Sequence, residues 1–388
     1  MSTKNQTGLA AELPQIPSFD LKRNYARVED EIKAALAGVL ASQHFILGPE
    51  VAAFEREVAG YLEVPHAITC ASGTDALLLT LMALGIGPGD EVITTPFTFF
   101  ATASCITRLG AKPVFVDVEP DTYNIDVTRV AAAITPRTKA FIPVHVFGQL
   151  CRLEEVVDLL DEKGVALVED CAQAIGAHRM RDGRIVKSGA WGGLGCFSFF
   201  PTKNLGAYGD AGMTTCFDDS AARELAKLRV HGATTTYIHE EVGINSRMDA
   251  MQAAILRVRL RHLEEWIEER REVARRYKLL FAEHQLQGEI TIPVEERGNR
   301  HTYHQYVVKA SRRDELQKFL AERGIVTRVY YPLSLHMQPC FASAGYKKGD
   351  MPVSEKLCEE VLALPMFPEL YAEEQERIVG EIARFYKK

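Results

Sequence analysis

From about residue 64 onward, short runs of β-branched and apolar residues alternate with stretches of helical spacing, and this alternation constrains the fold more than any other feature. The predicted strands are residues 67–70, 91–94, 113–118, 140–144, 166–169, 196–199 and 213–217, and the helices between them include 75–84, 99–109 and 153–162. Strands that alternate with helices of this length form βαβ units, whose parallel strands are covered by helices on both faces. We therefore expect an α/β fold with a mostly parallel sheet.

The pattern changes after Arg247, where the sequence predicts one long helix that bridges two parts of the chain. Its apolar positions repeat at helical spacing, at Leu256, Leu260, Leu263, Ile267, Ala274, Tyr277 and Phe281. The smaller α/β layer expected beyond it contains a strand at 303–310, a helix at 314–323, a strand at 326–331 and a closing helix at 373–386. An amphipathic helix near residues 28–40 is predicted to pack on this second layer.

The length of 388 residues and the 47% share of hydrophobic residues predict a globular protein of roughly two to three domains. We expect residues 1–45 to form an N-terminal segment that packs on a small domain. Residues 46–255 are predicted to form a large domain, and residues 256–388 a small C-terminal domain that includes the linking helix.

The charge and the apolar pattern exclude several classes of protein. The chain has 45 basic and 52 acidic residues, a net charge of -7 without blocks of like charge, so nothing favours nucleic acid. No apolar run has the length of a membrane span, and the opening residues lack a signal-peptide pattern, which predicts a cytoplasmic location. The eight cysteines form no CxxC pair, and His145, His231 and His336 have no metal-ligand spacing, so we expect no metal.

Lys203 lies in a glycine-rich turn, residues 199–212, directly after the predicted strand 196–199. A lysine held at the end of a buried strand is partly desolvated, which lowers its pKa and makes its neutral amine available for Schiff-base formation. Taken alone, such a lysine is more often a solvated loop residue, so its significance depends on what surrounds it.

Asp170 ends another apolar strand, and ligands of open α/β sheets bind beyond the carboxyl ends of the strands. A carboxylate beside a pyridine nitrogen keeps that nitrogen protonated, which strengthens the electron withdrawal of the ring. The alternatives for Asp170 alone are a helix cap or a metal ligand.

Two further segments follow predicted strands. Ser72-Gly73-Thr74 opens a helix, where glycine lets the backbone approach an anion and the helix start favours a phosphate, although the same residues also suit a simple capped turn. Phe99 follows another strand and could stack on a flat cofactor, although phenylalanine at such spacing is more often a core residue.

Together these residues resemble the DegT/DnrJ/StrS-type family of sugar aminotransferases. The segments that carry the resemblance are Phe45 to Val51, Ser72 to Leu77, Val168 to Gln173, Ser198 to Gly206 and Asn245 to Asp249. The resemblance covers nearly the whole chain from about Phe45. It implies an aspartate-aminotransferase-like fold (fold type I), a three-layer sandwich with a smaller C-terminal α/β domain, in which the large domain binds pyridoxal 5'-phosphate.

The resemblance also implies roles for individual residues. Lys203 would form the Schiff base with the cofactor and move the proton between two carbon centres, Asp170 would pair with the pyridine nitrogen, and Gln173 would contact the phenolic oxygen. The residues implied to hold the phosphate are Gly73, Thr74, Ser198 and, from a partner subunit, Asn245. The implied assembly is a homodimer with a shared active site.

Two positions test the resemblance. Several relatives carry tryptophan or tyrosine where this chain has Phe99, which keeps a stacking face and loses a polar group. Some family members replace the lysine with histidine and act as dehydratases, so Lys203 favours amino transfer.

The activity implied by the resemblance is transfer of an amino group from L-glutamate to a nucleotide-linked keto sugar, for amino-sugar or surface-polysaccharide (lipopolysaccharide) biosynthesis. The C3 ketone of a UDP-linked acetamido sugar is favoured, and Arg247 and Tyr303 are predicted to contact the substrate. C4 amination and a cyclitol substrate are the alternatives within the family. A nicotinamide-dependent sugar enzyme is disfavoured, because the glycines after strand 196–199 do not have the spacing of a dinucleotide-binding turn.

Overall fold

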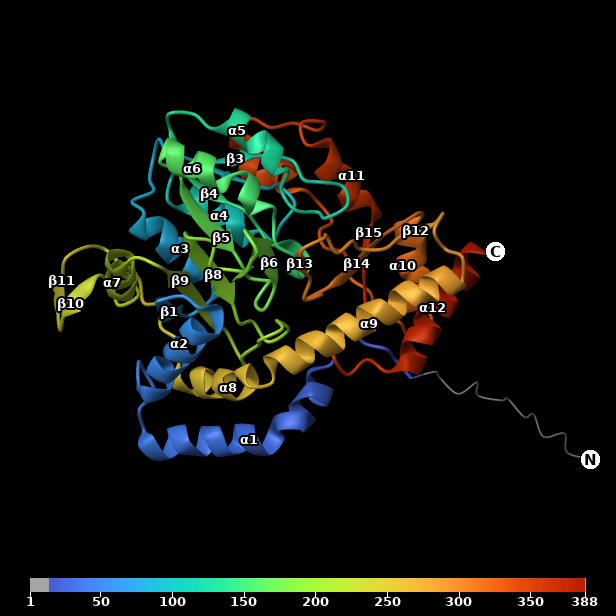
Figure 1. Cartoon of the computed structure of the whole chain (residues 1–388), viewed down its shortest axis with the longest axis horizontal. Coiled ribbons are helices and arrows are strands. Elements are labelled where there is room, and N and C mark those ends of the chain that lie inside the picture. Colours follow the sequence, from blue (N-terminus) through green and yellow to red (C-terminus); the bar gives the residue numbers. More distant parts are fainter. Residues whose placement is uncertain (1–13, 388) are drawn as a thin grey trace, which may run out of the picture.

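The computed structural model describes residues 14–387 and is built around a seven-stranded sheet (Figure 1). Its strands, in spatial order, are β1 (His66–Cys70), β9 (Gly212–Cys216), β8 (Leu194–Ser198), β5 (Ala166–Asp170), β4 (Thr138–Ile142), β2 (Glu91–Thr94) and β3 (Lys112–Phe115). The pairs from β8 to β3 are parallel, and β9 runs antiparallel to both of its neighbours. The prediction of an α/β fold with a mostly parallel sheet is confirmed.

Helices cover both faces of this sheet because its strands carry apolar side chains on both faces. Val168 and Cys196 share one hydrophobic cluster with α3 (Gly73–Ala83), α4 (Ala101–Arg108) and α7 (Asp219–Leu228). Phe197 and Leu167, on the opposite face, belong to clusters that include α2 (Pro49–Leu62) and α6 (Val157–Lys163). The result is the expected three-layer arrangement.

The long helix predicted after Arg247 is two helices, α8 (Ala250–Leu260) and α9 (Leu263–Glu283), separated at Arg261 and His262. The prediction of one helix was wrong because the two halves have different neighbours. Helix α8 packs against α1 (Leu21–Ser42) and α2, whereas α9 packs against α12 (Ala372–Tyr386) beside a second sheet (Figure 1).

The second sheet has three antiparallel strands in the order β12 (Ile290–Thr291), β14 (Tyr306–Ala310) and β15 (Val361–Leu364). Helices α10 (Arg313–Ala321) and α12 confirm the predicted helices of this region, and α11 (Pro352–Glu360) precedes β15. The predicted strand 326–331 was wrong. Arg328 forms only an isolated bridge with Ala363, and the strand that pairs with β14 at this position is β15.

Helix α1 is longer than the predicted helix at 28–40 and touches both parts of the molecule. Its Val28 and Ile32 pack with Val258 of α8 and Trp266 of α9. Near its start, Arg23 forms a bidentate ion pair with Glu374 of α12. The domain boundaries near residues 45 and 255 remain a prediction.

Smaller elements complete the fold. They are the sheet of β6 (His178–Arg181), β7 (Arg184–Lys187) and β13 (Asn299–Arg300), the hairpin of β10 (Ala233–Thr235) and β11 (Ile238–His239), α5 (Val130–Ala133), and short 3₁₀ turns at Val127–Arg129, Val146–Gly148, Leu153–Glu155, Leu335–Met337 and Pro339–Ala344. Within residues 14–387, no helix combines the length and the apolar character that a membrane crossing requires.

Candidate active site

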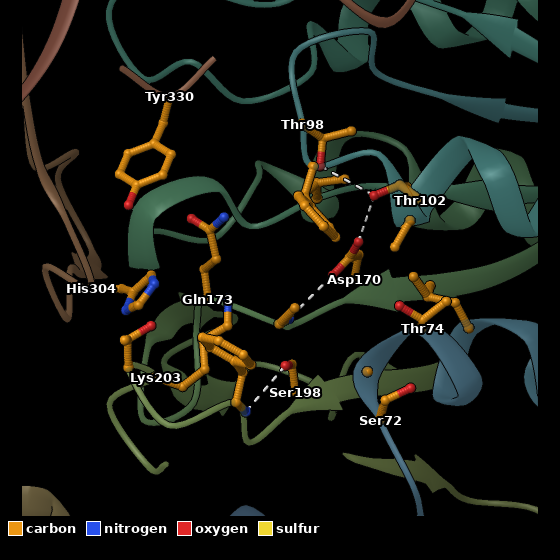
Figure 2. A pocket seen from close by; sticks show the side chains of 18 of the residues that line it. Ser72, Thr74, Thr98, Thr102, Asp170, Gln173, Ser198, Lys203, His304 and Tyr330 are labelled. Atoms are coloured by element: carbon orange, nitrogen blue, oxygen red, sulfur yellow. Dashed lines mark hydrogen bonds between the residues drawn. The ribbon is translucent and has the colours of Figure 1, made fainter. Parts of the chain in front are cut away.

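A cavity of about 450 Å³ lies at the carboxyl ends of the parallel strands, and residues just before β14 and at positions 330 and 331 border its other side. The main sheet contributes Asp170 from β5 and Ser198 from β8, and Lys203 follows β8. His304 and Tyr330 line it from the other part of the chain. Figure 2 shows these two residues on one side of the cavity and Ser72, Thr74 and Ser198 on the other.

Lys203 is placed by a tight turn between β8 and β9. Its backbone N–H donates to the carbonyl of Phe200 at 2.8 Å, and the N–H of Ala207 donates to the carbonyl of Phe199 at 2.7 Å. A Cβ atom at Gly206 would lie 2.3 Å from the carbonyl oxygen of Pro201, so this turn requires glycine. Part of Lys203 borders the cavity. Burial lowers the pKa of its amine to about 8, although the negative charge of Asp170 partly opposes this shift.

Asp170 is a buried carboxylate held in a fixed orientation. Thr102 donates its hydroxyl hydrogen to Oδ2 at 2.8 Å, and the N–H of Ala172 donates to Oδ1 at 3.1 Å. Burial raises the pKa of Asp170, while these two hydrogen bonds and the charge of Lys203 partly oppose the shift. A desolvated carboxylate beside a cavity is suited to a cationic ligand group, such as a protonated pyridine nitrogen.

The start of α3 forms a cradle for an anion. The Ser72 side chain caps the helix by accepting a hydrogen bond from the N–H of Asp75 at 3.1 Å. A Cβ atom at Gly73 would lie 2.6 Å from the Cβ of Ser198, and one at Gly212 would lie 2.2 Å from the carbonyl oxygen of Ser72. The close approach of β8, β9 and α3 therefore depends on glycine and leaves the helix start facing the cavity.

Gln173 is fixed at both ends of its amide. Its Oε1 accepts from the backbone N–H of Phe147 at 2.8 Å, and its Nε2 donates to the hydroxyl of Tyr331 at 2.9 Å. Because an amide nitrogen carries two hydrogens, one remains for a ligand in the cavity.

The structure brings most of the predicted site residues together. Those that border the cavity are Gly73, Thr74, Phe99, Asp170, Gln173, Ser198 and Lys203. Asn245 is exposed and Arg247 partly exposed, and neither lines this cavity of their own chain. Tyr303 lines a separate hollow beside α9 and stacks on His301, with ring centroids 4.0 Å apart.

Sequence reasoning missed several residues of the cavity. Thr98 and Thr102 form a hydroxyl chain that ends on Asp170 (Figure 2), with the two threonine oxygens 3.1 Å apart. His304 lines the wall opposite the anion cradle, and burial together with the charge of Lys203 holds its pKa well below the usual value. No motif marks these residues, because the two threonines reach Asp170 through tertiary contact between α4 and β5, and His304 comes from the other part of the chain.

Comparison with known proteins gives consistent matches over almost the whole chain. A model of the DegT/DnrJ/EryC1/StrS aminotransferase family matches residues 26–383. A pleiotropic regulatory protein from Geobacillus stearothermophilus is 50% identical over 373 residues, which cover 96% of this chain and 99% of that protein. A UDP-N-acetyl-3-dehydro-alpha-D-glucosamine 3-aminotransferase from Acidithiobacillus ferrooxidans is 45% identical over 369 residues, 95% of this chain and 97% of that enzyme.

Among solved structures, that of DesV from S. venezuelae in complex with a ketimine intermediate is similar, with a TM-score of 0.92 and 39% identity. The match covers 97% of this chain and 100% of DesV. Fold and sequence therefore lead to the same group of proteins.

Proposed function

The chain belongs to the DegT/DnrJ/EryC1/StrS aminotransferase family and is a pyridoxal-phosphate-dependent sugar aminotransferase, and we propose that it moves an amino group from L-glutamate to a ketone of a nucleotide-linked sugar. The observation that carries this proposal is the shared cavity of Lys203 and Asp170, a lysine with a lowered pKa and a carboxylate with a raised one. Pairs of titratable groups shifted in this way are typical of active sites.

The residues around the cavity fit pyridoxal phosphate. Lys203 would hold the cofactor aldehyde, and Asp170 would face the ring nitrogen. The phosphate would lie at the start of α3, where Gly73, Thr74 and Ser198 meet. Gln173 would donate its free amide hydrogen to the phenolic oxygen, and Phe99 would cover one face of the ring.

The bound cofactor supplies an electron-withdrawing ring that stabilises negative charge on the substrate carbon that loses its proton. The amine of Lys203, once released from the cofactor, would be the base that takes up this proton and gives it back, since its lowered pKa leaves a large neutral fraction near pH 8. Asp170 would keep the ring nitrogen protonated, and the chain of Thr98 and Thr102 holds its carboxylate in place.

We favour the C3 ketone of a UDP-linked acetamido sugar as the acceptor. The relative from Acidithiobacillus ferrooxidans is by its name a 3-aminotransferase of such a sugar. The relative with 50% identity has the name of a regulatory protein. The cavity of this chain, with Lys203 and Asp170 in place, favours catalysis over regulation alone.

An assay with purified protein tests the function. We expect a yellow protein whose visible absorption is bleached by L-glutamate with release of 2-oxoglutarate, and restored fastest by a UDP-linked 3-keto acetamido sugar among UDP- and dTDP-linked 3-keto and 4-keto sugars. A protein that ignores glutamate would contradict amino transfer from this donor. Faster turnover with a dTDP-linked or 4-keto sugar would contradict the proposed acceptor alone.

The proposed assembly is a homodimer in which Asn245 of each chain completes the phosphate site of the other. Two side chains at the cavity, Phe99 and Phe200, are 60% and 50% exposed, which favours a second copy as their cover. Sedimentation should give a dimer, and Asn245→Ala should weaken cofactor binding although Asn245 lies outside the cavity of its own chain. A monomer with normal cofactor affinity would contradict this assembly.

A further inference from the structure

Directly beside Asp170, a fully buried histidine and glutamate form a pair. The Nε2 of His145 and the Oε2 of Glu169 are 2.9 Å apart, and both side chains are 0% exposed. Glu169 also accepts from the backbone N–H of Gly189 and from that of Trp191, each at 3.0 Å. Three donors around one carboxylate suit its acceptor-only, ionised form.

The hydrogen bonds also settle which nitrogen of His145 carries the proton. Its Nδ1 accepts from the backbone N–H of Cys151 at 3.2 Å, so the hydrogen of the neutral ring lies on Nε2 and is donated to Glu169. His145 therefore ties both ends of the loop 145–151 to β5, one end through its own backbone and the other through Cys151.

This loop contacts Asp170 and Gln173, the two residues proposed to face the polar atoms of the cofactor ring. The backbone N–H of His145 donates to the carbonyl oxygen of Asp170 at 3.1 Å. Two residues later, the N–H of Phe147 donates to the Oε1 of Gln173 at 2.8 Å. Phe147 has a φ of 58°, in the left-handed region, so neighbouring contacts must hold the loop in this shape.

We propose that His145 and Glu169 are positioning residues that hold the loop 145–151, and that the loop in turn fixes Asp170 and the amide of Gln173 against the cofactor ring. This inference rests on the proposed function. Stability alone does not require such a pair, because apolar residues of similar volume often fill a core as well as a buried pair that includes a charged group. The pair instead contributes a fixed geometry for Asp170 and Gln173, which would face the ring nitrogen and the phenolic oxygen.

Glu169→Gln is the direct test, with Glu355→Gln as the matched control. Glu355 forms the same kind of pair with the buried His336, with Oε1 and Nε2 3.0 Å apart, and neither residue lines the cavity. The amide introduced by Glu169→Gln replaces one acceptor oxygen with a donor, so either the hydrogen bond from Trp191 or those from His145 and Gly189 are lost, depending on the orientation of the amide. We expect a rise of about tenfold in the dissociation constant of pyridoxal phosphate and a shifted visible band, at the lower end of the about 10- to 100-fold effect of residues that orient the ligands of metal sites.

The control should keep the wild-type band and cofactor affinity even if its melting temperature falls. If both variants lose stability and keep the wild-type band and affinity, the pair is structural and the positioning role is overturned. A wild-type chain that binds no pyridoxal phosphate would overturn the proposed function as well, which separates the two failures.

Substitution of His145 provides a second arm if Glu169→Gln does not fold. His145→Gln retains one donor for Glu169 and one acceptor for Cys151. It should therefore keep the wild-type band and an affinity for pyridoxal phosphate within about threefold of wild type. His145→Leu removes both and should behave like Glu169→Gln. Equal spectra and affinities for the two His145 variants would overturn the proposal.

Discussion

The two sides of the cavity are built in different ways. The cofactor side consists of residues at the ends of regular strands, in the tight turn after β8 and at the start of α3: Ser72, Gly73, Thr74, Asp170, Ser198 and Lys203. The opposite wall consists of His304, Gln305, Tyr330 and Tyr331, which lie outside the strands of the second sheet. The first set is fixed by the sheet and by the short turns that directly follow its strands, and the second by irregular backbone and by contacts between the two parts of the chain.

The comparison separates chemistry from selectivity. Residues placed by a sheet keep their geometry when surface loops change, which suits a cofactor site whose chemistry is constant. Residues on irregular segments tolerate substitution and re-shaping, which suits recognition of different sugars. We therefore expect substitutions on the cofactor side to abolish or slow both half-reactions, and substitutions on the wall to change the acceptor reaction alone.

The largest effect is expected for Lys203→Ala, which removes both the cofactor anchor and the base. Glutamate-dependent turnover should fall below detection, and the visible band should change. Lys163→Ala is the control, because Lys163 is exposed and pairs with its neighbour Glu162 at 2.7 Å. Normal turnover of Lys203→Ala, measured by release of 2-oxoglutarate, would contradict the assignment of this side of the cavity.

Asp170→Asn should lower the rate constant of the glutamate half-reaction by about 10²- to 10³-fold, the usual range for losing one preorganised electrostatic partner. The same change should leave the melting temperature of the apoenzyme equal or higher, because burial raises the pKa of Asp170 and thus disfavours its charged form. Stopped-flow absorbance and calorimetry measure the two quantities. A large loss of apoenzyme stability would mean that Asp170 is mainly structural.

The pKa of Lys203 predicts how pH affects cofactor capture by the apoenzyme. Below about 8 the amine is protonated and cannot attack an aldehyde, so the capture rate should rise about tenfold per pH unit up to about 8 and then level off. The rate of appearance of the visible band after mixing gives this profile. A rise that continues to about pH 10 would show an ordinary, solvated lysine.

Gly73→Ala tests the close approach of α3 and β8. The added Cβ would lie 2.6 Å from the Cβ of Ser198, so we expect the cofactor dissociation constant to rise about tenfold as the phosphate cradle shifts, a cost of about 1.4 kcal/mol. Gly60→Ala in α2 is the control, because a Cβ there meets nothing within 4 Å. Equal affinities for the two variants would show that the cradle is not the phosphate site.

The smallest effect is expected on the wall. Tyr330→Phe removes one hydroxyl that faces the cavity, which corresponds to about 1 kcal/mol, or roughly fivefold in KM for the keto sugar. The glutamate half-reaction should be unchanged. A parallel loss in both half-reactions would break the division between the two sides.

The cofactor side was largely predictable from sequence. Continuous apolar runs such as residues 165–168 mark buried parallel strands, and the glycines at 73 and 206 occupy positions where a Cβ would clash with backbone or with Ser198. Such local requirements can be recognised from the residue types at these positions.

The wall and the interdomain geometry were not predictable in this way. The apolar spacing from Leu256 to Phe281 continues across the break at Arg261 and His262, because both halves bury a helix face, although on different partners. Residues 326–331 have the composition of a strand, yet residue 328 forms only an isolated bridge with Ala363. Thr102 is placed by tertiary contact with Asp170, which no local pattern encodes.

The reversed direction of β9 has a consequence for how the chain can vary. Strands β8 and β9 are neighbours, and Ser198 pairs with Gly212. The segment that carries Lys203 therefore leaves β8 and enters β9 at the same end of the sheet. The N–H of Phe199 donates to the carbonyl of Ala211 at 2.8 Å, which closes the base of this excursion. One extra residue in it would displace the amine directly, whereas a crossover between parallel strands could absorb the same insertion at the far end of the molecule.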